Sequence, residues 1–358
     1  MRAAGADLAG EYFGQLLNRF EQAATAVGGA DTLGLEMAGL RLRLRYVGGG
    51  LREALLAPFE HLTRGDAADP DLTIWLFDTA STGVEPPPQP WEPIDVAPGT
   101  NPVARLRSEW ACVLAAAGSR GLTAALPAEG LAVFHLPDAT AIPASERAAP
   151  LREALQLLMA PRGRLMTHAG AVGRDGRGLL LVGRGGSGKS TLALSCANAG
   201  MEIVADDYVL LGPDSFTAHA MQSTAKLTED SAARLGIPAG AIDTAGFEPI
   251  LGGPAKALVE LRKLGSGTLK RQLEISAVLA PSLPSMDGEM GPAVRRISAA
   301  EGLRAVAPST IVQAGFGGGG SLARLADLVR RVPSYALDLS PDPAANAAAV
   351  DRLVAELG

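Results

Sequence analysis

The sequence predicts an α/β protein of two domains, an α+β domain over residues 1–145 followed by an α/β domain over residues 146–358. Its 358 residues suffice for about two domains at roughly 150 residues each. An apolar run at 178–182, a helix-like stretch at 190–199 and a second apolar run at 201–205 follow one another, which is the order of a βαβ unit in a parallel or mixed sheet. The 47% hydrophobic and 20% charged residues are typical of a globular chain.

The first 145 residues mix helical and strand patterns. Apolar residues recur at helical spacing in the opening segment, and leucine alternates with arginine from Leu40 to Arg45, as in a strand with one solvated face. Seven prolines between Pro86 and Pro102 exclude regular structure there and indicate a loop inside the domain. The patterns predict helices over 11–27 and 51–62 and strands over 40–45, 72–77 and 131–136.

The second domain opens with a helix over 151–160 and alternates strands with helices after it. A short apolar pair at 165–166 and a turn at 173–178 lead into the apolar run, and glycines separate this run from the next helix. The run at 317–320 is all glycine, which indicates a flexible connector. Further elements are predicted as a strand over 275–280 and helices over 302–307, 322–329 and 344–357.

Composition excludes several classes of protein. The net charge of −6 and pI of about 5.4, without a long Lys/Arg run, argue against nucleic acid as a partner. Cys112 and Cys196 lie far apart in the sequence, as expected of two reduced thiols in the cytosol. The first ten residues lack the apolar core of a signal peptide, and apolar stretches stay short of a membrane span. We therefore expect a cytoplasmic protein without a membrane partner.

A glycine-rich motif joins the first apolar run to the helix after it. Gly183-Arg-Gly-Gly-Ser-Gly-Lys189-Ser190 matches the P-loop (Walker A) pattern G-x-x-x-x-G-K-[ST] without a gap. Small residues let backbone N–H groups point at a polyphosphate, the lysine adds a cation, and the serine hydroxyl is offered to Mg²⁺. The motif predicts binding of ATP with Mg²⁺ by Gly183, Gly185, Gly186, Ser187, Gly188, Lys189, Ser190 and Thr191.

Charged residues elsewhere are candidates for catalysis. Asp206 and Asp207 end the second apolar run, where strand ends line ligand crevices; one carboxylate suits Mg²⁺ and the other suits proton abstraction. A solvated acidic turn is the alternative. His168, a lone histidine, is more often structural than catalytic. The cations Lys226, Lys256 and Arg262 suit phosphate neutralisation, although each one singly is typical of a solvated surface.

Three segments together resemble the catalytic domain of the HPr kinase/phosphorylase family. They are His168-Ala-Gly-Ala-Val172, the P-loop and Val204-Ala-Asp-Asp207, with Gly170 where the family usually has serine. The resemblance implies a fold similar to that of phosphoenolpyruvate carboxykinase and a homo-oligomer. It also implies that Lys189 and Ser190 hold phosphate and metal, that Asp206 is the general base toward a serine hydroxyl, and that Asp207 and His168 support the site, Asp207 as a metal ligand.

Other short segments resemble the diverged serine kinases encoded beside ribosomal peptide pathways, including lasso-peptide kinases. These segments are Asp71-Leu-Thr-Ile74, Ser81-Thr-Gly83, Glu146-Arg-Ala-Ala-Pro150, Ala255-Lys256 and Ala307-Pro-Ser-Thr310. The leading hypothesis is an ATP-dependent kinase acting on a serine of a peptide or protein that the first domain presents. Two alternatives stay open: a small-molecule or nucleotide kinase, with 262–271 as its arginine-bearing lid, and a non-enzymatic nucleotide switch.

Overall fold

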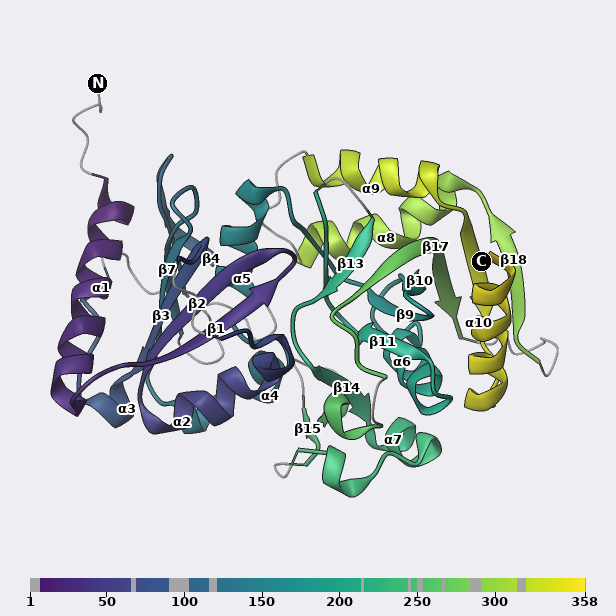
Figure 1. Ribbon diagram of the computed structural model, residues 1–358, viewed down its shortest axis with the longest axis horizontal. Coiled ribbons are helices and arrows are strands. Elements are labelled where there is room, and N and C mark those ends of the chain that lie inside the picture. Colours follow the sequence, from purple (N-terminus) through teal and green to yellow (C-terminus); the bar gives the residue numbers. More distant parts are fainter. Residues whose placement is uncertain are drawn as a thin grey trace. The chain divides into compact units, whose positions relative to one another are not determined.

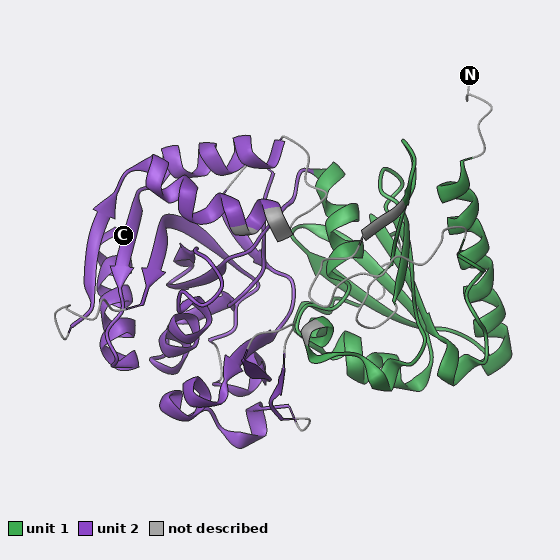
Figure 2. Ribbon diagram, turned by 180° about the vertical axis from the view of Figure 1, so that it is seen from behind, with its two compact units in different colours: residues 1–162 green, residues 163–358 purple. Residues whose placement is uncertain are grey.

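The computed structural model describes residues 7–65, 69–89, 103–115, 121–213, 216–243, 246–249, 254–265, 268–283, 291–313 and 320–357. It is a mixed α/β chain that divides into two compact units, Met1–Arg162 and Gly163–Gly358 (Figure 2). The division lies after Arg162 and not at the expected 145/146, because helix α5 packs on strands β6 and β7 of the first unit. Most of the predicted proline loop, residues 90–102, and the glycines 317–319 lie outside the described residues.

The first unit is built on a mixed sheet with the strand order β1-β2-β3-β7-β6-β5-β4. Strands β2, β3 and β7 run parallel, and the remaining neighbours are antiparallel. Its elements are α1 (Leu8–Val27), β1 (Asp31–Met37), β2 (Leu40–Val47), α2 (Gly49–Leu51), η1 (Arg52–Leu56), η2 (Ala57–Leu62), β3 (Leu72–Asp78), α3 (Thr79–Thr82), β4 (Val103–Arg107), β5 (Cys112–Ala115), β6 (Leu122–Leu126), β7 (Leu131–Leu136), η3 (Ala139–Ala141), α4 (Ala144–Arg147), α5 (Arg152–Met159) and η4 (Ala160–Arg162).

The core of this unit forms where α1 covers one face of the sheet (Figure 1). Leu16 and Phe20 of the helix are fully buried, and Phe20 meets Phe77 of β3 edge to face, with ring centroids 6.4 Å apart. Asp7 caps the helix by accepting the N–H of Gly10. The helical spacing that predicted this element therefore marks the face that packs on the sheet.

The predicted helix at 51–62 is helical but irregular. It consists of a single α-turn, a π-helical turn and a 3₁₀ stretch in succession. Pro58 stands near the start of the 3₁₀ stretch and has no N–H to continue an α-helical ladder. Proline thus explains why a regular helix does not run through this segment.

The second unit carries two sheets. The larger has the order β11-β9-β10-β17-β13-β12-β8, with β19 pairing β17 and β18, and the smaller has the order β14-β16-β15. The elements are β8 (Leu165–Thr167), β9 (Gly170–Arg174), β10 (Arg177–Leu181), α6 (Lys189–Asn198), β11 (Glu202–Ala205), β12 (Val209–Leu211), β13 (Thr217–Ala220), β14 (Thr224–Thr228), α7 (Glu229–Leu235), η5 (Ala239–Ala241), β15 (Glu248–Pro249), β16 (Ala255–Glu260), η6 (Leu261–Lys263), β17 (Gln272–Ser282), β18 (Ala293–Ile297), α8 (Ala299–Gln313), α9 (Gly320–Arg331), β19 (Ser334–Asp338) and α10 (Pro343–Leu357).

The strand–helix–strand succession of the motif is present, in a mixed sheet. Strands β10 and β11 both pair with β9 in antiparallel fashion, so β9 lies between them. On its other side β10 pairs in parallel with β17, which in turn pairs in parallel with β19. The carboxyl ends of β10, β17 and β19 therefore meet at one edge, from which the glycine loop leaves.

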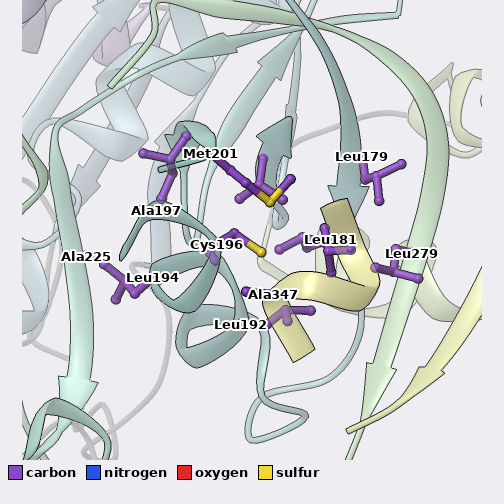
Figure 3. Packing of buried hydrophobic residues seen from close by; sticks show 14 of the residues in the cluster. Leu179, Leu181, Leu192, Leu194, Cys196, Ala197, Met201, Ala225, Leu279 and Ala347 are labelled. Atoms are coloured by element: carbon purple, nitrogen blue, oxygen red, sulfur yellow. The ribbon is translucent and has the colours of Figure 1, made fainter. Parts of the chain in front are cut away.

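The core of the second unit lies between this sheet and the helices α6 and α10, which pack against each other (Figure 1). Leu192 and Cys196 of α6 lie among residues of β10, β17 and α10 (Figure 3). Ala225 and Val259 of the smaller sheet join the same cluster. Packing from both sides fixes α6, and with it the glycine loop. Within the described residues, no helix combines the length and apolarity that a membrane crossing requires.

Candidate functional site

The glycine loop from Gly183 to Gly188 connects β10 to the first residue of α6. Gly183, Gly186 and Gly188 have φ of 140°, 81° and 94°, a region that only glycine enters readily. A Cβ at Gly188 would lie 2.5 Å from Leu339 Cδ1, so a side chain at this position would also require the end of Leu339 to move. The loop thus presents backbone at the amino end of a ten-residue helix, an arrangement that suits a phosphate group.

Lys189 lies across the inside of this loop. Its Nζ donates to the carbonyl oxygens of Gly183 and Arg184, at 2.8 and 3.1 Å. Burial lowers the pKa of its ammonium, and the nearby Asp207 and Asp206 partly offset that effect. The ammonium is therefore held at the loop, close to two negative charges.

Three hydroxyl side chains of the motif have different surroundings. Ser190 hydrogen-bonds to Asp206, which joins the loop to the carboxylate pair. The hydroxyl of Thr191 donates to Ser231 Oγ of α7 at 3.3 Å. Within the described part of the chain, Ser187 Oγ is buried without a hydrogen-bond partner. Of the three, Ser190 is the one placed to offer an oxygen to a metal beside the carboxylates.

Asp206 and Asp207 follow β11 and are both buried. Asp206 is 1% exposed, and its Oδ2 accepts the backbone N–H of Lys226 at 3.2 Å. Asp207 Oδ2 lies 2.6 Å from the Nζ of Lys226, and its Oδ1 lies 2.7 Å from Nε2 of His168. The structure thus brings together the aspartates, the histidine and the serine of the loop, whereas the alternative of a solvated acidic turn is wrong.

The two carboxylates have opposite electrostatic surroundings. Burial and the neighbouring Asp207 raise the pKa of Asp206 to about 6. Burial also opposes ionisation of Asp207, but the Lys226 ammonium and the His168 hydrogen bond together hold its pKa well below the usual range. Surroundings that move two adjacent carboxyl pKa values apart are typical of pairs that divide the roles of acid and base: here they keep Asp207 charged and favour a proton on Asp206.

His168 is a support for Asp207. Because an ionised carboxylate only accepts hydrogen bonds, Nε2 of His168 carries the proton it shares with Asp207. The centroid of the His168 ring lies 5.3 Å from that of the Tyr208 ring. The backbone N–H of His168 donates to Thr310 Oγ1 at 3.3 Å. These contacts fix the imidazole against the carboxylate.

Gly170 explains how β9 comes so close to the pair. A Cβ at this position would lie 3.1 Å from the carbonyl oxygens of Ala205 and Asp206, closer than side chains normally approach backbone. The absence of a side chain at Gly170 thus permits the tight strand contact next to Asp206.

The three cations named from the sequence have different positions. Lys226 of β14 is part of the site through both its backbone and its ammonium. Lys256 of β16 lies diagonally opposite Lys226 and acts electrostatically on Lys189. Arg262 pairs with Glu260 at 3.8 Å. Sequence reasoning did not find Tyr208 or Thr310; Tyr208 directly follows the aspartates, but Thr310 is 142 positions from His168 and has no local signal.

The described residues include no cluster of three or more His, Cys, Asp or Glu side chains that could hold a metal ion. Two carboxylates and the hydroxyl of Ser190 do lie together beside the glycine loop. This set fits Mg²⁺, which keeps several waters and is bound through one or two carboxylates plus substrate phosphates. The residues would therefore hold the ion together with a nucleotide.

No protein-family model and no curated protein matches this sequence. Among solved structures, the chain is similar to the Hpr(Ser) kinase/phosphatase from Coxiella burnetii, with 17% sequence identity and a TM-score of 0.29. The match covers 54% of this chain and 97% of that chain. At this identity and TM-score the similarity assigns no function.

Proposed function

We propose that this chain is an ATP- and Mg²⁺-dependent kinase that transfers the γ-phosphoryl group to a serine hydroxyl of a peptide or protein. The observation that carries the proposal is the position of Asp206, a buried carboxylate that is hydrogen-bonded to the serine of the phosphate loop. Its pKa of about 6 leaves it mostly ionised at neutral pH and still basic enough to accept a proton.

Each residue then has a step. The loop amides and Lys189 bind and orient the β- and γ-phosphates. Ser190 and Asp207 would hold Mg²⁺, which would supply charge neutralisation on the phosphates. Asp206 takes the proton as the serine oxygen bonds to the γ-phosphorus and the bond to ADP breaks. Before metal and nucleotide bind, His168 and Lys226 keep Asp207 ionised and oriented. Catalysis is thus positioning with electrostatic stabilisation.

A peptide acceptor is favoured over a small molecule by the segment 262–271. A small-molecule kinase normally closes an arginine-bearing lid, and this segment was the candidate for one. Its second half is tied to β11, because Ile203 N–H donates to Thr268 O and Lys270 N–H donates to Ile203 O, each at 2.8 Å. We propose that the acceptor is a ribosomally made peptide, of the lasso type that the sequence resemblance implies, and that the first unit presents it.

The test is incubation of the full chain with γ-labelled ATP, Mg²⁺ and ribosomal peptides ending in serine, with HPr as a comparison, followed by mass spectrometry. Asp206→Asn is the inactive control, and Asp230→Asn, an exposed aspartate of α7, is the matched active control. Phosphate on a peptide serine supports the proposal. Labelling of HPr alone would assign the activity of the parent family, and ATP binding without transfer would favour a nucleotide switch.

A further inference from the structure

Both oxygens of Asp207 are engaged by protein. His168 Nε2 lies 2.7 Å from Oδ1, and the Lys226 ammonium lies 2.6 Å from Oδ2. A metal that binds Asp207 directly must therefore share an oxygen with a hydrogen bond or replace one of these partners. Sharing Oδ2 with an ammonium places two cations within a few ångströms of each other, where repulsion in a partly buried site is strong.

The two partners differ in how easily they can move. The side chain of His168 is 7% exposed and packs against the ring of Tyr208, and its backbone is hydrogen-bonded to Thr310. The side chain of Lys226 is 20% exposed and has a flexible stem that ends in three rotatable donors. Lys226 is therefore the partner that can leave Asp207 without disturbing the fold.

The backbone of Lys226 would stay in place during such a movement. Its N–H donates to Asp206 Oδ2, and β14 is paired with β16 over its whole length. The ammonium can thus swing about a fixed Cα while the contact with Asp206 is kept. Lys189, with its Nζ on the glycine loop, is influenced by the charge of Lys226, so the phosphate loop lies within the electrostatic reach of the same ammonium.

We propose that Lys226 is a resident cation that occupies Oδ2 of Asp207 until a divalent ion arrives with nucleotide, and that its ammonium then transfers to the γ-phosphate. The inference rests on the proposed function, because it takes the phosphate loop and Asp207 as a metal–nucleotide site. It adds a switch of partners: Asp207 exchanges a monovalent for a divalent cation, and the released ammonium stabilises the transferred group. Free metal is thereby kept out of the site until phosphate is present to receive Lys226.

The experiment measures Mn²⁺ binding to the full chain by electron paramagnetic resonance, with Mn²⁺ as the probe for the divalent site. Without nucleotide, Lys226→Gln should bind Mn²⁺ about tenfold more tightly than the unmodified chain, a coupling of the usual size for two linked ligands. With a non-hydrolysable ATP analogue the effect should reverse, because the variant lacks the cation for the γ-phosphate; affinity for ADP should change little.

Lys270→Gln is the matched control, since it also removes a lysine from an ion pair, with Glu202 at 3.2 Å, and it should leave Mn²⁺ binding unchanged. Lys226→Arg covers the case in which the glutamine variant does not fold: it keeps the charge and should bind Mn²⁺ as weakly as the unmodified chain or more weakly. Equal or weaker Mn²⁺ binding by folded Lys226→Gln, or tighter binding by Lys226→Arg, would overturn the switch alone. An unmodified chain that binds neither the analogue nor its Mn²⁺ complex would overturn the proposed function as well.

Discussion

Replacing Asp206 by asparagine is expected to abolish catalysis and to stabilise the fold. Asparagine keeps the size of the side chain and an oxygen that can accept the Lys226 N–H, so the geometry is preserved. Loss of the base should lower the rate of transfer about 10²- to 10⁴-fold, while ATP affinity stays within a few-fold because the loop and Lys189 are unchanged.

The gain in stability follows from the pKa of Asp206. Burial and Asp207 raise this pKa from 3.8 to about 6. The contribution that neutral Asp206 makes to the stability of the fold is therefore fully present below about pH 4 and is lost as pH rises through about 6. At 1.36 kcal/mol per pH unit, ionisation at pH 8 costs the fold ~3 kcal/mol. Asparagine removes this cost, which corresponds to a rise in Tm of at least about 5 °C.

The assay combines single-turnover transfer, calorimetric ATP titration and thermal unfolding at pH 8 and pH 4.5. The stabilisation should be clear at pH 8 and small at pH 4.5, where Asp206 is already protonated in the unmodified chain. Transfer within tenfold of the unmodified rate would remove Asp206 as the base. An asparagine variant that melts at a lower temperature at pH 8 would refute the argument that the buried charge is destabilising.

Three further predictions concern the same unit and the thiols. The value of kcat/KM should rise about tenfold per pH unit below pH 6 and level off above it, because Asp206 accepts a proton only when ionised. A flat profile from pH 5 to 7.5 would exclude Asp206 as the base. Gly188→Ala should weaken ATP binding at least ~10-fold by calorimetry, because the left-handed φ and the contact with Leu339 both oppose a side chain; unchanged affinity would contradict the described loop. Cys112 and Cys196 should react with a thiol reagent only on unfolding, since both are buried and burial raises the pKa of each. Fast labelling of the native chain would contradict this prediction.

Local patterns were enough to predict the elements on either side of the glycine loop. The apolar run, the loop and the helix are contiguous, and the observed β10 and α6 begin and end within a residue or two of the expected positions. The first helix and the strand at 72–77 were predicted for the same reason, since amphipathic spacing and β-rich composition are local properties. The sequence did not predict the pairing of strands β8 and β12. Each has three residues, all buried, which is too short for an alternation of polar and apolar residues to show.

The candidate site was predictable only in part, because its partners come from distant strands. Asp206 and Asp207 were singled out by their place after an apolar run, and the structure puts them with Ser190 and His168. That Lys226 bonds both carboxylates could not be foreseen, since it depends on how β14 of the small sheet lies against the two residues that follow β11. The boundary between the units was misjudged for a similar reason: the packing of α5 on β6 and β7 is a tertiary property.

The parallel neighbours β10, β17 and β19 also determine when the glycine loop can form during synthesis. Leu339, directly after β19, packs against Gly188, although the two residues are far apart in the chain. Closing such long loops is slow, and the contact has to wait until β19 has left the ribosome. A nascent chain that carries the complete motif therefore still lacks this wall of the loop until β19 and Leu339 have been made.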